Sequence, residues 1–167
     1  MKFFSANIED LRTLYTDHLQ KALDMEEKIV KALPTMIEKS TDTELATAFR
    51  DHLEQTKGHV TKIQALLRKA TGEASTATCK VISSLVTSAE DSIKDAKDDS
   101  IRDISLIASG QEVEHHEMAV YGTLRTWAGI LGQRDHVAVL ESILQEEEAA
   151  DELLTQIAGH VNLQAAA

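Results

Sequence analysis

The sequence is poor in the residues that break helices or staple small domains. Its 167 residues include one cysteine, Cys79, one proline, Pro34, and seven glycines, and aromatic residues make up only 4%. A single cysteine excludes an internal disulfide framework and is typical of a reducing compartment. We interpret Cys79 as a small buried residue. With few helix breakers, and with alanine, leucine and isoleucine left to fill the core, the composition predicts an all-α protein.

Long apolar runs and a basic surface are also missing. No segment reaches the roughly 18 uncharged apolar residues of a membrane helix, and residues 1–6 contain no apolar signal region. The 28 acidic and 17 basic residues give a formal charge of −11, which opposes binding to nucleic acid or to an anionic membrane surface. We therefore expect a cytoplasmic protein with one domain, residues 1–167, that binds neither nucleic acid nor membranes.

Apolar residues recur every three or four positions in four long stretches and one short stretch. The predicted helices cover about residues 7–39, 42–71, 80–97, 100–131 and 135–161. Pro34 should kink the first helix or break its hydrogen-bond ladder near its end. Residues 40–43 should form a turn that supplies the next N-cap, and Gly72 should cap the end of the second helix.

The lengths of the connections predict how the helices are arranged. Short turns join the first two long helices and the last two, the latter at Gly132-Gln133-Arg134, so each pair should form an antiparallel hairpin. The long link between the hairpins contains the short helix and is typical of a ferritin-like four-helix bundle with one crossover. An ordinary up-down-up-down bundle is the main alternative.

Polar residues interrupt the apolar faces of the long helices near mid-length. A helical wheel at 100° per residue places several of them inward, and their distances from the connecting turns bring them to one level. The inward residues are Glu26 on the first helix; His52, Gln55, Thr56 and His59 on the second; Gln111, Glu114 and His115 on the third, with Glu117 at its boundary; and Glu147 and Asp151 on the last. We expect Glu54, Glu146 and Glu148 to be solvated, and Met118, Tyr121 and Trp127 to be packing residues.

Four inward carboxylates, those of Glu26, Glu114, Glu147 and Asp151, need compensation because an unpaired buried charge is costly. No inward lysine or arginine is predicted at this level. Two divalent cations would match four negative charges and also accept neutral imidazole, as in di-iron and di-manganese bundles. A lone inward histidine is more often a hydrogen-bonded core residue than a metal ligand. Three inward histidines beside four carboxylates nevertheless favour a metal site. His115 is the weakest of the three, because a neighbouring carboxylate could simply orient it.

Four segments resemble the YciF and YciE family (DUF892) of bacterial stress-associated ferritin-like proteins, and the resemblance covers nearly the whole chain. They are Met25-Glu26-Glu27-Lys28, His52-Leu53-Glu54-Gln55-Thr56, Val113-Glu114-His115-His116-Glu117 through Tyr121-Gly122-Thr123-Leu124, and Leu144-Gln145-Glu146-Glu147. The resemblance implies a ferritin-like bundle, a homodimer and a site for two metal ions, iron or manganese. By position, it implies Glu26, Glu114 and Glu147 as central ligands, with His52, His59, Glu117 and Asp151 as candidates around them. Gln55 stands where the family often has glutamate, and its neutral amide would be a weaker ligand.

Two functions remain open at this stage. The first is a stress-response protein that binds two iron or manganese ions and reacts with oxygen or peroxide, or sequesters metal. The second is a structural or partner-binding helical bundle whose metal site is vestigial or only stabilising. Gln55 and the absence of inward Glu-x-x-His pairs favour the second function, whereas the surplus of inward carboxylates favours the first.

Overall fold

The structure is a computed structural model that describes the backbone of residues 8–165 and the side chains of residues 8–163. Its five helices are α1 (Leu11–Lys39), α2 (Thr43–Thr71), α3 (Lys80–Asp95), α4 (Asp99–Ile130) and α5 (Arg134–Ala165). No strand occurs in this described part, so the predicted all-α class is confirmed. The predicted start of the first helix at residue 7 lies outside the described residues. No helix within residues 8–165 is long and apolar enough to cross a membrane.

Short polar side chains and two glycines set the ends of the helices. The carboxylates of Asp10, Asp42 and Asp98 accept hydrogen bonds from backbone N–H groups in the first turns of α1, α2 and α4. Gly72 ends α2 in the left-handed conformation with φ of 90°, as predicted, and Gly132 turns the chain between α4 and α5 with φ of 71°. Both glycines stand where a side chain would be strained.

Helix α1 continues through Pro34 to Lys39, so the proline does not end it. Proline has no N–H, and one bond of the helical ladder is therefore missing at this point. The buried side chains of Leu33 and Met36 anchor this last part of α1 in the core. Tertiary packing thus outweighs the local effect of the proline.

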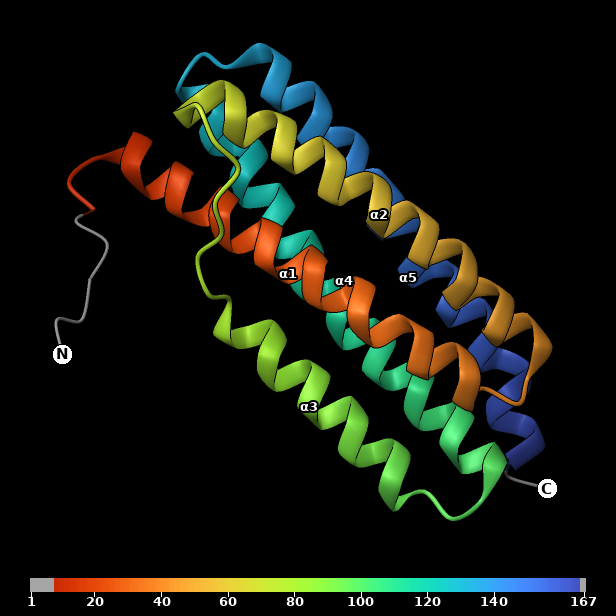
Figure 1. Ribbon diagram of the computed structural model, residues 1–167. Coiled ribbons are helices and arrows are strands. Elements are labelled where there is room, and N and C mark those ends of the chain that lie inside the picture. Colours follow the sequence, from red (N-terminus) through yellow and green to blue (C-terminus); the bar gives the residue numbers. More distant parts are fainter. Residues whose placement is uncertain (1–7, 166–167) are drawn as a thin grey trace, which may run out of the picture.

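Helix α1 packs along α2, and α4 packs along α5. The two hairpins meet through the pairs α1–α4 and α2–α5, while α3 runs along the outside against α4 and α1 (Figure 1). Helices α2 and α4 run in the same direction because α3 carries the chain back along the bundle between them (Figure 1). This is the ferritin-like arrangement with one crossover, and the up-down-up-down alternative is wrong.

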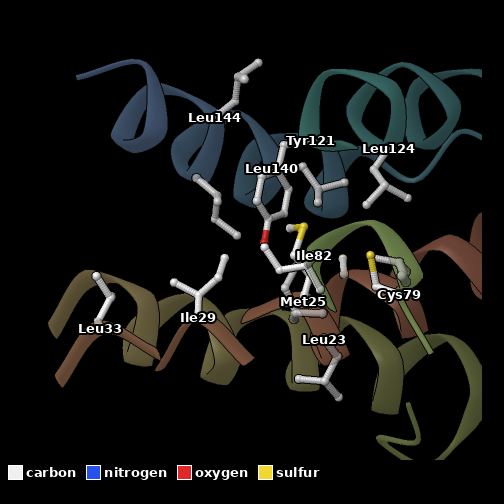
Figure 2. Close-up of a cluster of buried hydrophobic side chains, with 14 of the residues drawn as sticks. Leu23, Met25, Ile29, Leu33, Cys79, Ile82, Tyr121, Leu124, Leu140 and Leu144 are labelled. Carbon is white, nitrogen blue, oxygen red and sulfur yellow. The ribbon is translucent and has the colours of Figure 1, made fainter. Parts of the chain in front are cut away.

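Apolar side chains fill the bundle on both sides of a polar middle layer. Figure 2 shows Ile29 and Leu33 of α1 on one side of Tyr121 and Leu124 of α4 on the other, with the hydroxyl of Tyr121 directed toward α1. Cys79 precedes α3 and is buried at the edge of this core, which confirms its predicted environment. The rigid apolar layers fix the rotation of each helix and so the direction of the polar side chains between them.

Candidate metal centre

Four helices each direct acidic or imidazole side chains into the middle of the bundle. Six of these side chains are buried and form what we call the central cluster: Glu26 of α1, His52 and His59 of α2, Glu114 and Glu117 of α4, and Glu147 of α5. The two histidines lie seven residues apart, and the two α4 glutamates lie three apart, so each pair shares one face of its helix.

The central cluster divides into two groups that share Glu147. His52, Glu114, Glu117 and Glu147 form the His52 group, and Glu26, His59 and Glu147 form the His59 group. Within each group, one ligand atom from every residue lies within 4.8 Å of the others. A shared carboxylate between two such groups is the arrangement expected of a bridging ligand.

Side chains around the His59 group hold its members in place. His59 Nδ1 lies 2.9 Å from Glu147 Oε1 and 3.7 Å from Glu26 Oε2. The Tyr121 hydroxyl donates a hydrogen bond to Glu26 Oε1, whereas Glu26 Oε2 has no hydrogen bond. The Tyr121 hydroxyl therefore orients the Glu26 carboxylate.

Glu146 holds the other side of the His59 ring. Its Oε2 lies 2.5 Å from His59 Nε2, and Lys62 Nζ donates to the same carboxylate at 3.0 Å. A carboxylate at Nε2 keeps the proton on that nitrogen, so the lone pair of a neutral His59 would be at Nδ1, facing Glu147 and Glu26. This geometry is typical of a histidine oriented to bind a metal ion.

The His52 group has fewer partners. His52 Nε2 lies 3.3 Å from Glu114 Oε1, and its Nδ1 lies 4.0 Å from Glu147 Oε2. Neither ring nitrogen of His52 and neither oxygen of Glu117 makes a hydrogen bond with the described residues. This part of the cluster is therefore rich in buried donor atoms that the chain leaves unsatisfied.

Burial and mutual repulsion shift the proton affinities of the cluster. Burial, followed by the charge of Glu147, raises the pKa of the Glu114 and Glu117 carboxyls well above the usual range, and burial also raises the pKa of Glu26. Burial lowers the pKa of His52 to about 4. Burial alone would lower the pKa of His59, but the neighbouring carboxylates of Glu147 and Glu26 outweigh that effect and raise it to about 10.

Unpaired buried atoms are concentrated in this one place. Among the described side chains, every buried nitrogen or oxygen without a hydrogen bond, except Gln133 Oε1, belongs to the central cluster. Such groups are rare in native proteins, because each costs about 1–3 kcal/mol when desolvated without a partner. The salt-bridge partners of the six residues are one another and Glu146, and no lysine or arginine of the described chain pairs with them directly.

The donor set of the central cluster fits divalent cations. Four carboxylates supply up to four negative charges, two imidazoles supply neutral nitrogen, and the two groups are joined by one carboxylate. Oxygen and imidazole donors suit iron and manganese. A metal ion in each group would give partners to the atoms that otherwise have none.

The structure buries six of the eight residues predicted to bind metal in the central cluster and leaves the other two at its edge. Gln55 is exposed on α2, but it lines a hollow together with His52 and Glu114. Asp151 is half-buried at the edge of the cluster, 3.3 Å from Nε2 of the mostly exposed His115. Glu117, predicted at the boundary of its helix face, is fully buried. The ligand role of each of the eight residues stays a prediction.

Two residues near the cluster were not predicted to contact it. Glu146 was expected to be solvated, but its carboxylate forms a hydrogen bond with His59. Tyr121 was expected to be a packing residue, but its hydroxyl donates a hydrogen bond to Glu26. The sequence held a signal for Tyr121, which follows Glu117 by four residues and therefore shares its helix face. The partner of Glu146 lies on another helix, so periodicity within α5 could not reveal it.

The fold and the cluster define a ferritin-like helical bundle with a candidate di-metal centre. The chain matches the domain of unknown function DUF892 over residues 10–167, and it belongs to that family. It is 31% identical to the protein YciF of Escherichia coli K12 over 153 residues, which are 91% of this chain and 92% of YciF. The resemblance seen in the four sequence segments is confirmed.

Solved structures with the same architecture include two at 30% identity or more. The protein YcfI of Rhodopseudomonas palustris, described as a candidate structural protein, has a TM-score of 0.88 at 35% identity and covers 92% of this chain and 98% of its own. The E. coli stress protein YciF has a TM-score of 0.87 at 30% identity and covers 92% and 97%. A Xanthomonas campestris protein shares the fold with a TM-score of 0.73 at 21% identity, covering 93% of each chain.

Proposed function

We propose that this protein binds two divalent transition-metal ions, iron or manganese, one in the His52 group and one in the His59 group. The observation that carries the proposal is the set of buried carboxylate and imidazole atoms that have no hydrogen-bond partner. A fold does not keep so many unpaired buried groups at one point without compensation, since each destabilises the folded chain.

Each of the two groups of the central cluster would form one metal position. Glu147 would bridge the two ions, Glu114, Glu117 and His52 would complete one position, and Glu26 and His59 the other. Glu146 and Tyr121 would position His59 and Glu26 through their hydrogen bonds. When bound, iron or manganese would supply a redox centre for reaction with oxygen or peroxide.

Protons would take the place of the metal ions in the metal-free protein. The pKa values of Glu26, Glu114 and Glu117 are raised, and that of His59 is about 10, so these groups keep their protons to higher pH than they would in water. Metal binding would then release protons, because carboxylates and neutral imidazole are the forms that bind a cation. The folded bundle can therefore persist without metal while remaining ready to bind it.

The comparisons support a proposal for the physiological setting. E. coli YciF is described as a stress protein, and we propose a related role for this chain, in which it sequesters metal or consumes oxygen or peroxide. A cytoplasmic location and a homodimer belong to the same proposal.

A structural role is the second candidate, because the R. palustris neighbour is described as a candidate structural protein. In that case the protonated cluster would be a stabilising or vestigial feature, and the outer faces of the helices would bind a partner. The two candidates differ in one simple property, the uptake of metal by the purified chain.

Metal quantification on anaerobically prepared protein tests the proposal. We expect about two iron or manganese ions per chain, and loss of both in Glu147→Ala. Glu148→Ala is the matched control, because Glu148 is the next residue of α5 and is exposed. Metal-free protein whose melting temperature is unchanged by added Fe²⁺ or Mn²⁺ would favour the structural role.

A further inference from the structure

Two hollows of different chemistry reach the same pair of cluster residues, His52 and Glu114. One, which we call the polar hollow, lies between α2 and α5, and polar side chains of Asp51, Gln55 and Glu146 contribute to its walls. The other lies between α1, α3 and α4. Phe49 lines both hollows.

Apolar side chains make up most of the second hollow, which we call the α3 cavity. Ile29 and Leu33 of α1, Val86 and Ala89 of α3, and Val113 of α4 line it. Its charged lining residues other than His52 and Glu114 are Lys31 and Glu90. The apolar part of these walls offers no partner to an ordered water, which needs two to four polar partners.

The size of the α3 cavity limits what it can hold. Its volume is about 60 Å³, well above the roughly 10–15 Å³ that one water requires. It is also well below the roughly 150 Å³ of an apolar cavity that binds benzene. A single small apolar molecule fits these limits, and an aromatic ring does not.

The α3 cavity ends on one half of the cluster only. Its lining includes His52 and Glu114, whose atoms His52 Nδ1, His52 Nε2 and Glu114 Oε2 have no hydrogen bond. Among the described residues that line it, none belongs to the His59 group. A molecule in the cavity would therefore meet the His52 group and not the other.

Gly110 contributes to the wall that separates the two hollows. A Cβ atom at this position would lie 3.3 Å from Phe49 Cε1 and 3.0 Å from Leu154 Cδ1. Because glycine has no side chain, Phe49 and Leu154 can pack directly against α4, with the Phe49 ring between the apolar and the polar hollow.

We infer that the α3 cavity is a binding site for one small uncharged apolar molecule, held beside the His52 group, while cations reach the same group through the polar hollow between α2 and α5. The crossover helix α3 is then the wall of a ligand site and not only a connection. Delivery of the molecule to a metal ion rests on the proposed function, but the existence of the site does not.

Xenon binding to the metal-free full-length chain tests the site itself. We expect ¹²⁹Xe and methyl NMR spectra to show one xenon atom near Ile29, Leu33 and Val113. Ala89→Leu, which fills the α3 cavity, should weaken xenon binding roughly tenfold or more. Ala150→Leu is the matched control, because Ala150 lines the polar hollow on the other side of His52, and it should bind xenon as the unmodified chain does.

Val86→Leu is a second filling variant in case Ala89→Leu folds poorly, since Val86 lines the same cavity. Failure of the unmodified chain to bind xenon would overturn the inference. Xenon binding by both filled variants that is as strong as that of the unmodified chain would overturn it too.

Loading with Mn²⁺ tests whether the cavity opens onto the metal site. Bound ¹²⁹Xe should relax several times faster in Mn²⁺-loaded protein than in Zn²⁺-loaded protein, because the paramagnetic ion would lie beside His52. Equal relaxation with both ions bound would overturn the inference. Failure of Mn²⁺ to bind would instead contradict the proposed function, and the xenon comparison of the variants would still decide on the cavity.

Discussion

Two regions of this bundle bury carboxylates in opposite ways. Beside the turn between α1 and α2, Asp103 is 3% exposed and accepts hydrogen bonds from Thr41 N at 2.9 Å, Thr41 Oγ1 at 2.6 Å and Asp42 N at 2.8 Å. In the middle of the bundle, Glu117 is 0% exposed and neither of its oxygens has a partner among the described residues.

The difference shows what each carboxylate does for the molecule. The chain supplies Asp103 with donors, and this carboxylate holds the α1–α2 turn against α4. The unpaired atoms of Glu117 and its neighbours are therefore not a general feature of this core. They support the proposal of a partner that is not part of the chain, and two metal ions would fit that description.

The largest expected effect separates the two regions by metal binding. Glu114→Ala should lower the affinity for Mn²⁺ by more than about 100-fold, because it removes a ligand of the His52 group. Asp103→Ala should leave the affinity unchanged. Isothermal titration of both variants measures this, and equal Mn²⁺ binding by the two would remove Glu114 from the site.

The second effect is on the free energy of unfolding of the metal-free protein. Asp103→Ala should lower it by about 2–4 kcal/mol, because the N–H groups of Thr41 and Asp42 and the Thr41 hydroxyl lose a charged acceptor. Glu117→Gln should leave it unchanged or raise it, because it removes an unpaired buried acid. Urea denaturation in the presence of a chelator measures both, and a large loss of stability in Glu117→Gln would show that the chain itself satisfies this carboxylate.

A smaller effect concerns the side chain that orients His59. Glu146→Gln should weaken metal binding by about 10–100-fold, because the amide is a poorer acceptor for the ring nitrogen that carries the proton. Nitrogen-15 NMR of the histidine rings should show a change in the tautomer of His59. Glu148→Gln, at an exposed site two residues further along α5, is the control. An unchanged tautomer and an unchanged affinity would show that Glu146 has only a surface role.

The smallest expected effect is the response of the metal-free protein to pH. The pKa of His59 is about 10 in the folded chain against its ordinary 6.5, so its contribution to stability is complete below pH 6.5 and is lost as the pH rises through 10. The raised pKa values of Glu114 and Glu117 act in the same direction. We expect relaxation of the chain around the charged groups to limit the loss to about 1–2 kcal/mol.

Metal should reverse that pH dependence, because protons compete with the cation for the same ligands. The melting temperature of metal-free protein should therefore fall between pH 6.5 and pH 9, whereas that of protein saturated with Mn²⁺ should not fall. Parallel curves for the two forms would contradict the assignment of the cluster as a metal site.

Much of the fold and the depth of the site could be predicted from the sequence. Periodicity places Glu26, His52, His59, Glu114 and Glu147 on inward faces, and equal distances from short turns bring them to one level. These two rules hold because antiparallel helices of similar length lie side by side. Local cap chemistry likewise placed the ends of the helices to within a few residues.

What could not be predicted depends on how the helices are rotated against one another. Gln55 lies about 60° around α2 from His52 at 100° per residue, and packing turns that edge of the helix to solvent. Asp151 lies one turn further along α5 than Glu147, where α4 presents the exposed His115. The bond between Glu146 and His59, and the cavity behind α3, join residues of different helices, so no single stretch of sequence encodes them.

Anomalous diffraction from crystals loaded with Mn²⁺ tests the central claim most directly. We predict two manganese peaks about 3.5–4 Å apart, one in the His52 group and one in the His59 group, with Glu147 between them. Strong peaks only on the surface, or none within the central cluster at saturating Mn²⁺, would contradict the claim.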